Sequence, residues 1–360
     1  MNYFKDFKTK KAKSKLMKAY FKDIKSKYIM KIIFNNLIKK KQLEIVNYNN
    51  KLQNRLNFDL SDFKKFSEIY SSIEIKIIPS KAKYGKFINI HNEKDKPYFH
   101  IFFDNREEEI KRNFLNENER VSNIKIIIDY QIKSFSGLFQ NCCKIESLSF
   151  TKCCRNNIID SSFMFDGCKS LKRLNLSVFN TGSVTNMNCM FNECSTLKEL
   201  NLSKFNTKNV NNMICLFNEC SSLKELNLSK FNTENVTKMN GMFANCQSLI
   251  QLNLSSFNTN KVIDMSYMFS GCSLLKELEL SNLSNKSVIN MSYMFSKCSS
   301  LEELNISNFS YNGNINVNNI FKGCSLLKKL IIIEFKISDS EKEKHIFSGC
   351  SLELRKQFNC

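Results

Sequence analysis

Apolar and polar positions recur at one fixed interval of 26 residues over most of the chain. In the unit that begins at Cys168, the apolar positions hold Leu171, Leu174, Leu176, Phe179, Val184, Met187, Met190 and Phe191. One interval later the same positions hold Leu197, Leu200, Leu202, Phe205, Val210, Met213, Leu216 and Phe217. A pattern repeated in this way indicates one structural unit copied end to end.

The spacing inside each unit predicts a short strand followed by a helical arc. The sequence Leu174-Asn175-Leu176 alternates with period two, which places both leucines on one face of a strand. The later apolar positions, from Val184 to Cys194, follow at steps of three and four, which is typical of the inward stripe of a short helix. A lone unit buries too little apolar surface to fold, so we expect neighbouring units to stack.

The full repeated phrase resembles a known repeat class. From Cys194 to Thr207 and from Cys220 to Thr233 it reads Cys-x-x-Leu-x-x-Leu-x-Leu-x-x-Phe-Asn-Thr, and Val-x-x-Met-x-x-Met-Phe-x-x-Cys follows in the repeat. Over about residues 121–350, in about nine units, this is similar to the BspA-like class of leucine-rich repeats. The resemblance implies an α/β fold: a right-handed solenoid with a parallel sheet on the concave face and helical arcs on the convex face. It also implies binding of proteins or cell surfaces, without catalysis.

Both ends of the array depart from the repeat, as capping units do. We expect the array to begin near Val121, with a first strand at Ile124–Ile128 and a first inward stripe from Ile132 to Cys142. At the other end, the polar segment Ser340–Lys344 replaces the usual inward Val and Met and predicts a stop. Residues 351–360 are then expected to form a short tail.

Outward strand positions form the candidate binding surface. With the strand leucines inward, two columns point outward, and the surface they make is polar and acidic in its middle. Because it holds almost no aromatic residues, we expect a broad surface of weak contacts rather than a tight pocket. The candidate residues are Arg173, Asn175, Glu199, Asn201, Glu225, Asn227, Gln251, Asn253, Glu277, Glu279, Glu303 and Asn305.

A column of asparagines and the column of cysteines are predicted to be structural. Asn side chains can satisfy buried backbone groups of the turns along the stack, and this column holds Asn180, Asn206, Asn232 and Asn258. The cysteines share the apolar register of the core, so we interpret them as buried, reduced thiols. Neighbouring copies would lie about 4.8 Å apart, so distance alone does not exclude disulfides. The column holds Cys142, Cys168, Cys194, Cys220, Cys246, Cys272, Cys298, Cys324 and Cys350.

Motifs for catalysis or metal binding are not recognised. The three histidines, His91, His100 and His345, are widely separated, and the only close cysteine sets are adjacent pairs rather than zinc-type spacings. The chain has no Gly-rich phosphate loop and no Gly-x-Ser-x-Gly elbow. We therefore predict a protein that is not an enzyme and binds no metal or cofactor.

Residues 1–120 are predicted to form a separate, basic α+β domain. Helices are expected over about 14–70, and strands over about 73–103 at Ile73–Ile77, Phe87–Ile90 and Tyr98–Phe102. Residues 1–60 carry sixteen Lys or Arg against four Asp or Glu, within a chain of net charge +20. Such a basic end suits nucleic acid or an anionic membrane, although a solvated basic face is the more ordinary interpretation.

Targeting signals are also not recognised, because lysines interrupt the first apolar stretches and Tyr28–Leu37 is too short to span a membrane. We therefore expect a cytoplasmic protein without a transmembrane segment.

The N-terminal apolar segments leave the function open. The stretch from Ile29 to Leu37, with Leu43, Ile45, Tyr48 and Leu52, resembles the F-box helix pair that precedes leucine-rich repeats in ubiquitin-ligase substrate receptors, but lacks its usual Leu-Pro and Trp. The resemblance implies docking to a Skp1-like adaptor through Ile29, Ile33, Phe34 and Leu37. Three hypotheses follow: a protein-interaction scaffold whose N-terminal domain caps the array, an F-box-like adaptor, and a BspA-like surface adhesion protein.

Overall fold

The computed structural model describes residues 68–80, 84–309, 315–332 and 345–358. Its contacts divide the chain into two compact units, Met1–Ser71 and Ser72–Cys360. The expected boundary near Val121 is therefore not where the structure divides, because the strands before Val121 belong to the same compact unit as the repeats. The helices expected over about 14–70 lie almost entirely outside the described residues.

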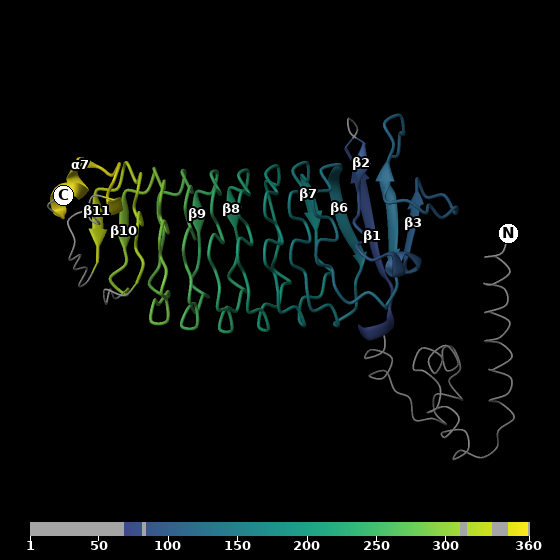
Figure 1. The fold of residues 1–360 in the computed structure, drawn as a ribbon, viewed down its shortest axis with the longest axis horizontal. Coiled ribbons are helices and arrows are strands. Elements are labelled where there is room, and N and C mark those ends of the chain that lie inside the picture. Colours follow the sequence, from purple (N-terminus) through teal and green to yellow (C-terminus); the bar gives the residue numbers. More distant parts are fainter. Residues whose placement is uncertain (1–67, 81–83, 310–314, 333–344, 359–360) are drawn as a thin grey trace, which may run out of the picture. The chain divides into compact units, whose positions relative to one another are not determined.

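A mixed five-stranded sheet opens the second unit. Its strands are β1 (Ile73–Pro79), β3 (Phe99–Phe103), β5 (Ile124–Ile128), β6 (Ile145–Lys152) and β7 (Arg173–Asn175), in the order β3-β5-β1-β6-β7. Strand β1 runs antiparallel to both β5 and β6, whereas β6 and β7 are parallel. The expected first strand of the array, β5, therefore forms but does not pair with the next unit, because β1 lies between them (Figure 1).

Alternating isoleucines explain this insertion. Ile73, Ile75 and Ile77 of β1 are fully buried, as are the three alternating isoleucines of β5. Each strand therefore presents one apolar face to the core while its backbone pairs with a neighbour on either side. Lys125 on β5 and Glu74 on β1 form an ion pair of 3.5 Å beside this pairing.

The segment Phe87–Ile90 was expected to be a strand, and this prediction is wrong. Only β2 (Gly85–Lys86) is extended and paired there, with β4 (Phe114–Leu115). Phe87 and Ile88 are consecutive and both fully buried, so the segment does not alternate between a core face and a solvent face. A 3-10 helix, η1 (Glu93–Tyr98), takes up the start of the expected third strand, which begins at Phe99.

Later units contribute short parallel strands. Strand β8 (Glu225–Leu226) pairs with β9 (Gln251–Leu252), and β10 (Glu303–Asn305) pairs with β11 (Lys329–Ile331). Each pair joins residues that differ by one repeat interval, for example Leu226 and Leu252. Figure 1 shows the units side by side in a row from β6 to β11.

The second half of each unit, which we call the arc, is built from turns and not from the expected helix. In the arc from Val184 to Cys194, Met190 N–H donates to Met187 O at 3.2 Å, whereas Phe191 N–H donates to Leu216 O of the next unit at 3.0 Å. Cys189 and Glu193 have positive φ values of 52° and 56°. Left-handed residues and bonds to the next unit interrupt the i to i−4 pattern, so a continuous α-helix cannot form.

Bridges between arcs continue through the whole row. Equivalent residues pair in parallel from each unit to the next, and the series holds Ser134, Asp160, Asn186, Asn212, Lys238, Asp264, Asn290 and Asn316. The inward apolar residues of each arc therefore lie on stacked turns. Such turns place every third or fourth side chain inward, as a helix does, so the two share one sequence pattern.

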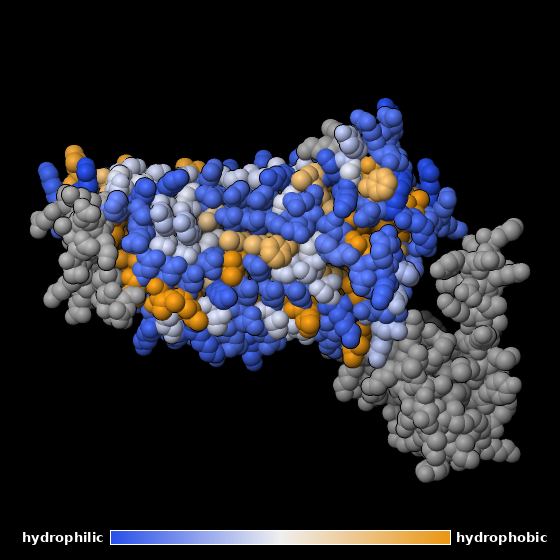
Figure 2. Space-filling model, in the orientation of Figure 1, coloured by the Kyte–Doolittle hydropathy of each residue, from blue (hydrophilic) through white to orange (hydrophobic). Residues whose placement is uncertain are grey.

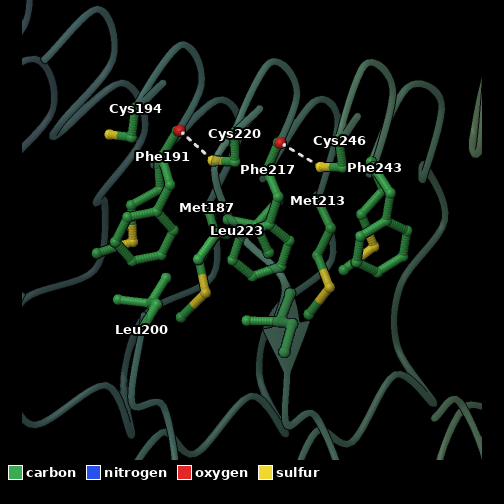
Figure 3. Close-up of a cluster of buried hydrophobic side chains, with 14 of the residues drawn as sticks. Met187, Phe191, Cys194, Leu200, Met213, Phe217, Cys220, Leu223, Phe243 and Cys246 are labelled. Carbon is green, nitrogen blue, oxygen red and sulfur yellow. Dashed lines mark hydrogen bonds between the residues drawn. The ribbon is translucent and has the colours of Figure 1, made fainter. Parts of the chain in front are cut away.

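Figure 3 shows the core along three consecutive arcs, where methionines, phenylalanines and leucines pack together. The arc phenylalanines form a ladder with ring centroids 5.6–5.8 Å apart, and the rings lie almost parallel. Phe217, for example, is fully buried between Phe191 and Phe243. Such offset stacking adds to the stabilisation that burial provides.

A helix, and not the expected tail, follows the last unit. Helix α7 (Leu352–Gln357) begins at the N-cap Ser351, whose hydroxyl accepts from Leu354 N–H. Leu354 is fully buried, and Phe358 stacks on Phe347 with centroids 4.8 Å apart. These contacts cover the last rung of the core. The predicted polar stop at Ser340–Lys344 lies outside the described residues.

Candidate functional site

All twelve residues of the predicted binding surface are exposed. They alternate with buried leucines: Glu225 and Asn227 are exposed, whereas Leu226 and Leu228 are 6% and 0% exposed. The expected strand positions therefore present two outward columns, although the structure forms no strand at 199–201 or 277–279. We call the first the strand-face column, which holds Arg173, Glu199, Glu225, Gln251, Glu277 and Glu303, and the second the cap column, which holds Asn175, Asn201, Asn227, Asn253, Glu279 and Asn305.

The cap column has a local structural task. In each unit its side-chain oxygen accepts from a backbone N–H two residues later, as Asn201 Oδ1 does from Ser203 N–H at 3.0 Å and Glu279 Oε1 from Ser281 N–H at 2.9 Å. This hydrogen bond lowers the pKa of the Glu279 carboxyl. Because these oxygens shape the turn after the strand, the strand-face column is the better candidate for contact with a partner.

Ion pairs on this face lie at its two ends. Lys172 contacts Glu146 at 3.6 Å, and Lys329 contacts Glu303 at 3.1 Å. Between these ends, within the described residues, Glu199, Glu225 and Glu277 take part in no ion pair. The middle of the strand-face column thus presents three carboxylates to solvent, one repeat interval or a multiple of it apart.

The predicted asparagine column shapes turns, but within its own unit. Asn206 Oδ1 accepts from Lys208 N–H at 3.1 Å, and Asn180, Asn232 and Asn258 make the equivalent bond. Asn206 and Asn258 are exposed. The expected role of these side chains in the turns is therefore confirmed, but each bond closes a turn of its own unit and the groups it joins are not deeply buried.

A column of threonines bonds the turns of neighbouring units to each other. Thr181 Oγ1 donates to Asn206 O at 3.0 Å and accepts from Asn206 N–H at 2.7 Å, so one hydroxyl pairs both backbone groups of the next turn. Thr207, Thr233 and Thr259 repeat this arrangement, and all four are 1% exposed. The recurring Phe-Asn-Thr triplet is the sequence signal that could have revealed the column.

In the second unit, after β6, Arg155 occupies the position of these threonines. It is fully buried, and its Nη1 donates to Ile132 O at 2.8 Å and to Asp129 O at 3.2 Å. Burial lowers the pKa of this guanidinium to about 10. Arg155 therefore ties the second unit to the first.

The nine predicted column cysteines are all buried, between 0% and 7% exposed. From Cys168 onward each thiol donates to the carbonyl oxygen of a phenylalanine in the preceding unit, at 3.0–3.3 Å. Figure 3 shows two of these bonds, from Cys220 to Phe191 and from Cys246 to Phe217. Burial raises the pKa of Cys220 and Cys272 to about 12, which disfavours the reactive thiolate.

A cleft of about 430 Å³ lies at the start of the array. Its lining includes Asn89, His91, Asp95, Ser136 and Gln140. His91 Nε2 lies 3.3 Å from Gly137 O, and Asn89 Nδ2 donates to Gln140 O at 2.7 Å. These contacts join the segment before the array to the first arc. Among the described residues, no three His, Cys, Asp or Glu side chains are grouped to hold a metal ion.

The proposed docking residues Ile29, Ile33, Phe34 and Leu37 lie outside the described residues. Within the described ranges, none of the helices has the length and hydropathy needed to cross a bilayer.

Comparison with known proteins connects this architecture to one family. No curated protein matches the chain. A family model described as "Mycoplasma protein of unknown function, DUF285" matches twice, at residues 133–252 and 248–357. The two matches together span more than half of the chain and nearly all of the repeated units. The chain therefore belongs to the DUF285 family.

Figure 2 shows that hydrophilic residues cover most of the face drawn, with smaller hydrophobic patches between them. The chain of net charge +20 thus presents a largely polar exterior on that side.

Proposed function

We propose that this protein is a non-catalytic protein-binding scaffold. In this proposal the repeats form a right-handed leucine-rich repeat solenoid, and the strand-face column lies on its concave side. The 26-residue register of the parallel pairs, such as Leu226 with Leu252, supports the proposal. The twelve exposed positions provide the variable surface, while the buried positions keep the repeat.

The single observation that carries the proposal is the row of carboxylates at Glu199, Glu225 and Glu277. They are exposed, they share one column, and they take part in no ion pair within the described residues. Structural roles for surface carboxylates come mostly from capping or pairing, and these three make neither contact. A row of this kind suits a partner that places basic or hydrogen-bond donor groups along an extended segment, where complementary charge sets specificity and association rate.

The experiment compares the full chain with a triple charge reversal. Partners are first captured by reversible cross-linking to the full chain in its own cells, and the dissociation constant of each is then measured with purified protein. The test variant carries Glu199→Lys, Glu225→Lys and Glu277→Lys. The control variant carries Glu219→Lys, Glu234→Lys and Glu353→Lys, three exposed carboxylates outside the strand-face column.

Both variants change the net charge equally, so they separate a local surface from a general charge effect. We expect the test variant to lose about tenfold or more in affinity, or about 1.4 kcal/mol, and the control to bind like the unaltered chain. Equal losses of affinity in the two variants would mean that net charge, and not the strand-face column, determines binding. Unchanged binding in the test variant would place the binding surface elsewhere.

A further inference from the structure

Two cysteines outside the buried cysteine column lie in adjacent units on the arcs. Cys189 and Cys215 occupy the same repeat position, and Cys189 N–H donates to Ile214 O beside Cys215 at 2.8 Å. We call this position the outer arc column. Its residues all have positive φ, and the column holds Phe163, Cys189, Cys215, Gly241, Tyr267, Tyr293 and Asn319.

The backbone places the two thiols next to each other. Cys189 and Cys215 have φ values of 52° and 50°, so their side chains leave the backbone in similar directions. Adjacent units in a parallel stack lie about 4.8 Å apart, and disulfide-linked Cα atoms lie about 4.4 to 6.8 Å apart. The two thiols are also close enough for each to shift the pKa of the other. A covalent bond between them therefore needs no separation or rotation of the units.

Their surroundings differ from those of the buried cysteine column. Cys194 and Cys220 are fully buried, whereas Cys189 and Cys215 are only partly buried. Beside Cys215 the next unit has Gly241, where a Cβ atom would lie 2.9 Å from the Cys215 sulfur. The Cys215 sulfur therefore lies against Gly241, in space that a side chain there would need, while Cys215 itself stays partly exposed.

The two thiols are not equivalent. The interaction between the two side chains raises the pKa of Cys189 and lowers that of Cys215, so the Cys215 sulfur carries more of the thiolate. Cys189 Sγ also donates to Asn188 Oδ1 at 3.1 Å, which favours its neutral form. The nearby Asp166 carboxylate opposes ionisation of both thiols. Cys215 is thus the better nucleophile and Cys189 the better-protonated neighbour.

We propose that Cys189 and Cys215 form a dithiol modification site for low-molecular-weight disulfides. The Cys215 thiolate attacks one sulfur of the small disulfide, forming a mixed disulfide and releasing one small thiolate, which takes up a proton. Cys189 then loses its proton to solvent and attacks the Cys215 sulfur. The second small thiolate leaves, and a disulfide joins the two units. The small disulfide is reduced to two thiols, and the protein pair is oxidised by two electrons.

Oxidised glutathione serves as the probe for the reduced full chain under native conditions. Intact mass and peptide mapping should show a disulfide between Cys189 and Cys215, with no adduct retained on either. The variant Cys189→Ser should keep a stable glutathione adduct on Cys215. In Cys215→Ser, the reaction at Cys189 should slow at least tenfold. The control Cys154→Ser removes an exposed thiol and should leave the disulfide unchanged.

A second measurement on the unaltered chain needs no variant. Phenylarsine oxide bridges two thiols only where they are neighbours, so pretreatment should protect Cys189 and Cys215 together from glutathione. The proposal is overturned by two separate, stable adducts in the unaltered chain. It is equally overturned if these two cysteines react no faster than Cys194 and Cys220, or if phenylarsine oxide protects neither.

Discussion

The strand half and the arc half of each unit differ in how they join neighbouring units. On the strand side, assigned strands in the later units are only two or three residues long, such as β8 and β9. On the arc side, which has no α-helix or strand in the described residues between Ser134 and Cys324, parallel bridges continue from Ser134 to Asn316. Regular secondary structure is therefore a poor guide to where this stack is held together.

This difference between the two halves assigns most of the contacts between units to the arc side and the exposed, variable positions to the strand side. The arc side combines backbone bonds between units, the phenylalanine ladder and the buried thiols, all of which join one unit to the next. The strand side fixes its inward leucines but leaves the strand-face column exposed. Residues there can change with little cost to folding, which is what a binding surface requires. Each prediction below tests this division.

Alkaline pH should have the largest effect, because it acts on the whole thiol column at once. The folded pKa of Cys220 and Cys272 is about 12, against 9.0 for an exposed thiol. Between these values the unfolded chain has lost a proton that the folded chain keeps. Stability is therefore fully present below pH 9 and falls as the pH rises toward 12, by up to about 1.4 kcal/mol per pH unit for each thiol.

Urea unfolding at pH 8, 9, 10 and 11 measures this slope. The variant Cys220→Ala should show a shallower slope, whereas Cys154→Ser, at an exposed position, should keep the original slope. A stability that stays constant from pH 9 to 11 would contradict the burial of the thiol column.

Phe217→Ala should be the most destabilising single change among those compared here. Phe217 is fully buried, and its ring stacks on Phe191 at 5.6 Å and on Phe243 at 5.7 Å. We expect a loss of about 3 to 5 kcal/mol from the free energy of unfolding, because a cavity opens in the ladder. Urea denaturation measures it. If Phe217→Ala loses less unfolding free energy than Leu226→Ala, the arc side does not contribute more to stability than the strand side.

Leu226→Ala tests the strand side. Leu226 is 6% exposed and points inward from β8, so we expect a loss of about 2 to 5 kcal/mol, in the lower part of that range. Its neighbour Glu225 is exposed, and Glu225→Ala should stay within about 0.5 kcal/mol of the unaltered chain. Similar losses at both positions would show that the strand register is wrong.

Thr207→Val tests a bond between units that involves a single hydroxyl. The Thr207 hydroxyl donates to Asn232 O at 2.8 Å and accepts from Asn232 N–H at 2.8 Å. Valine fills the same space but leaves both groups without this partner, so we expect a loss of about 1 to 3 kcal/mol. Thr207→Ser keeps the hydroxyl and should lose less. If Thr207→Val is as stable as the unaltered chain and only Thr207→Ser loses stability, the hydroxyl contributes nothing and only the methyl group matters.

Several elements could be anticipated from local pattern. The repeat interval identified the buried cysteines. It also identified the exposed positions on either side of the inward leucines, such as Glu225 and Asn227 beside Leu226. The helix expected in the arc was wrong because inward spacing of three and four residues fits stacked turns as well as it fits a helix. The strand at Phe87–Ile90 was wrong because both Phe87 and Ile88 are buried, which apolar content alone does not reveal.

The sequence by itself determined the repeat length, the inward side chains and the exposed columns, since identical neighbours at a fixed interval must meet in identical ways. Only the tertiary structure decided that β1 inserts between β5 and β6, because that pairing joins distant segments that compete for the same strand edges. It also decided that threonines and not asparagines connect the turns, and that Cys189 meets Cys215. These outcomes depend on which polar atoms of neighbouring units come within bonding distance, and a linear pattern does not specify that.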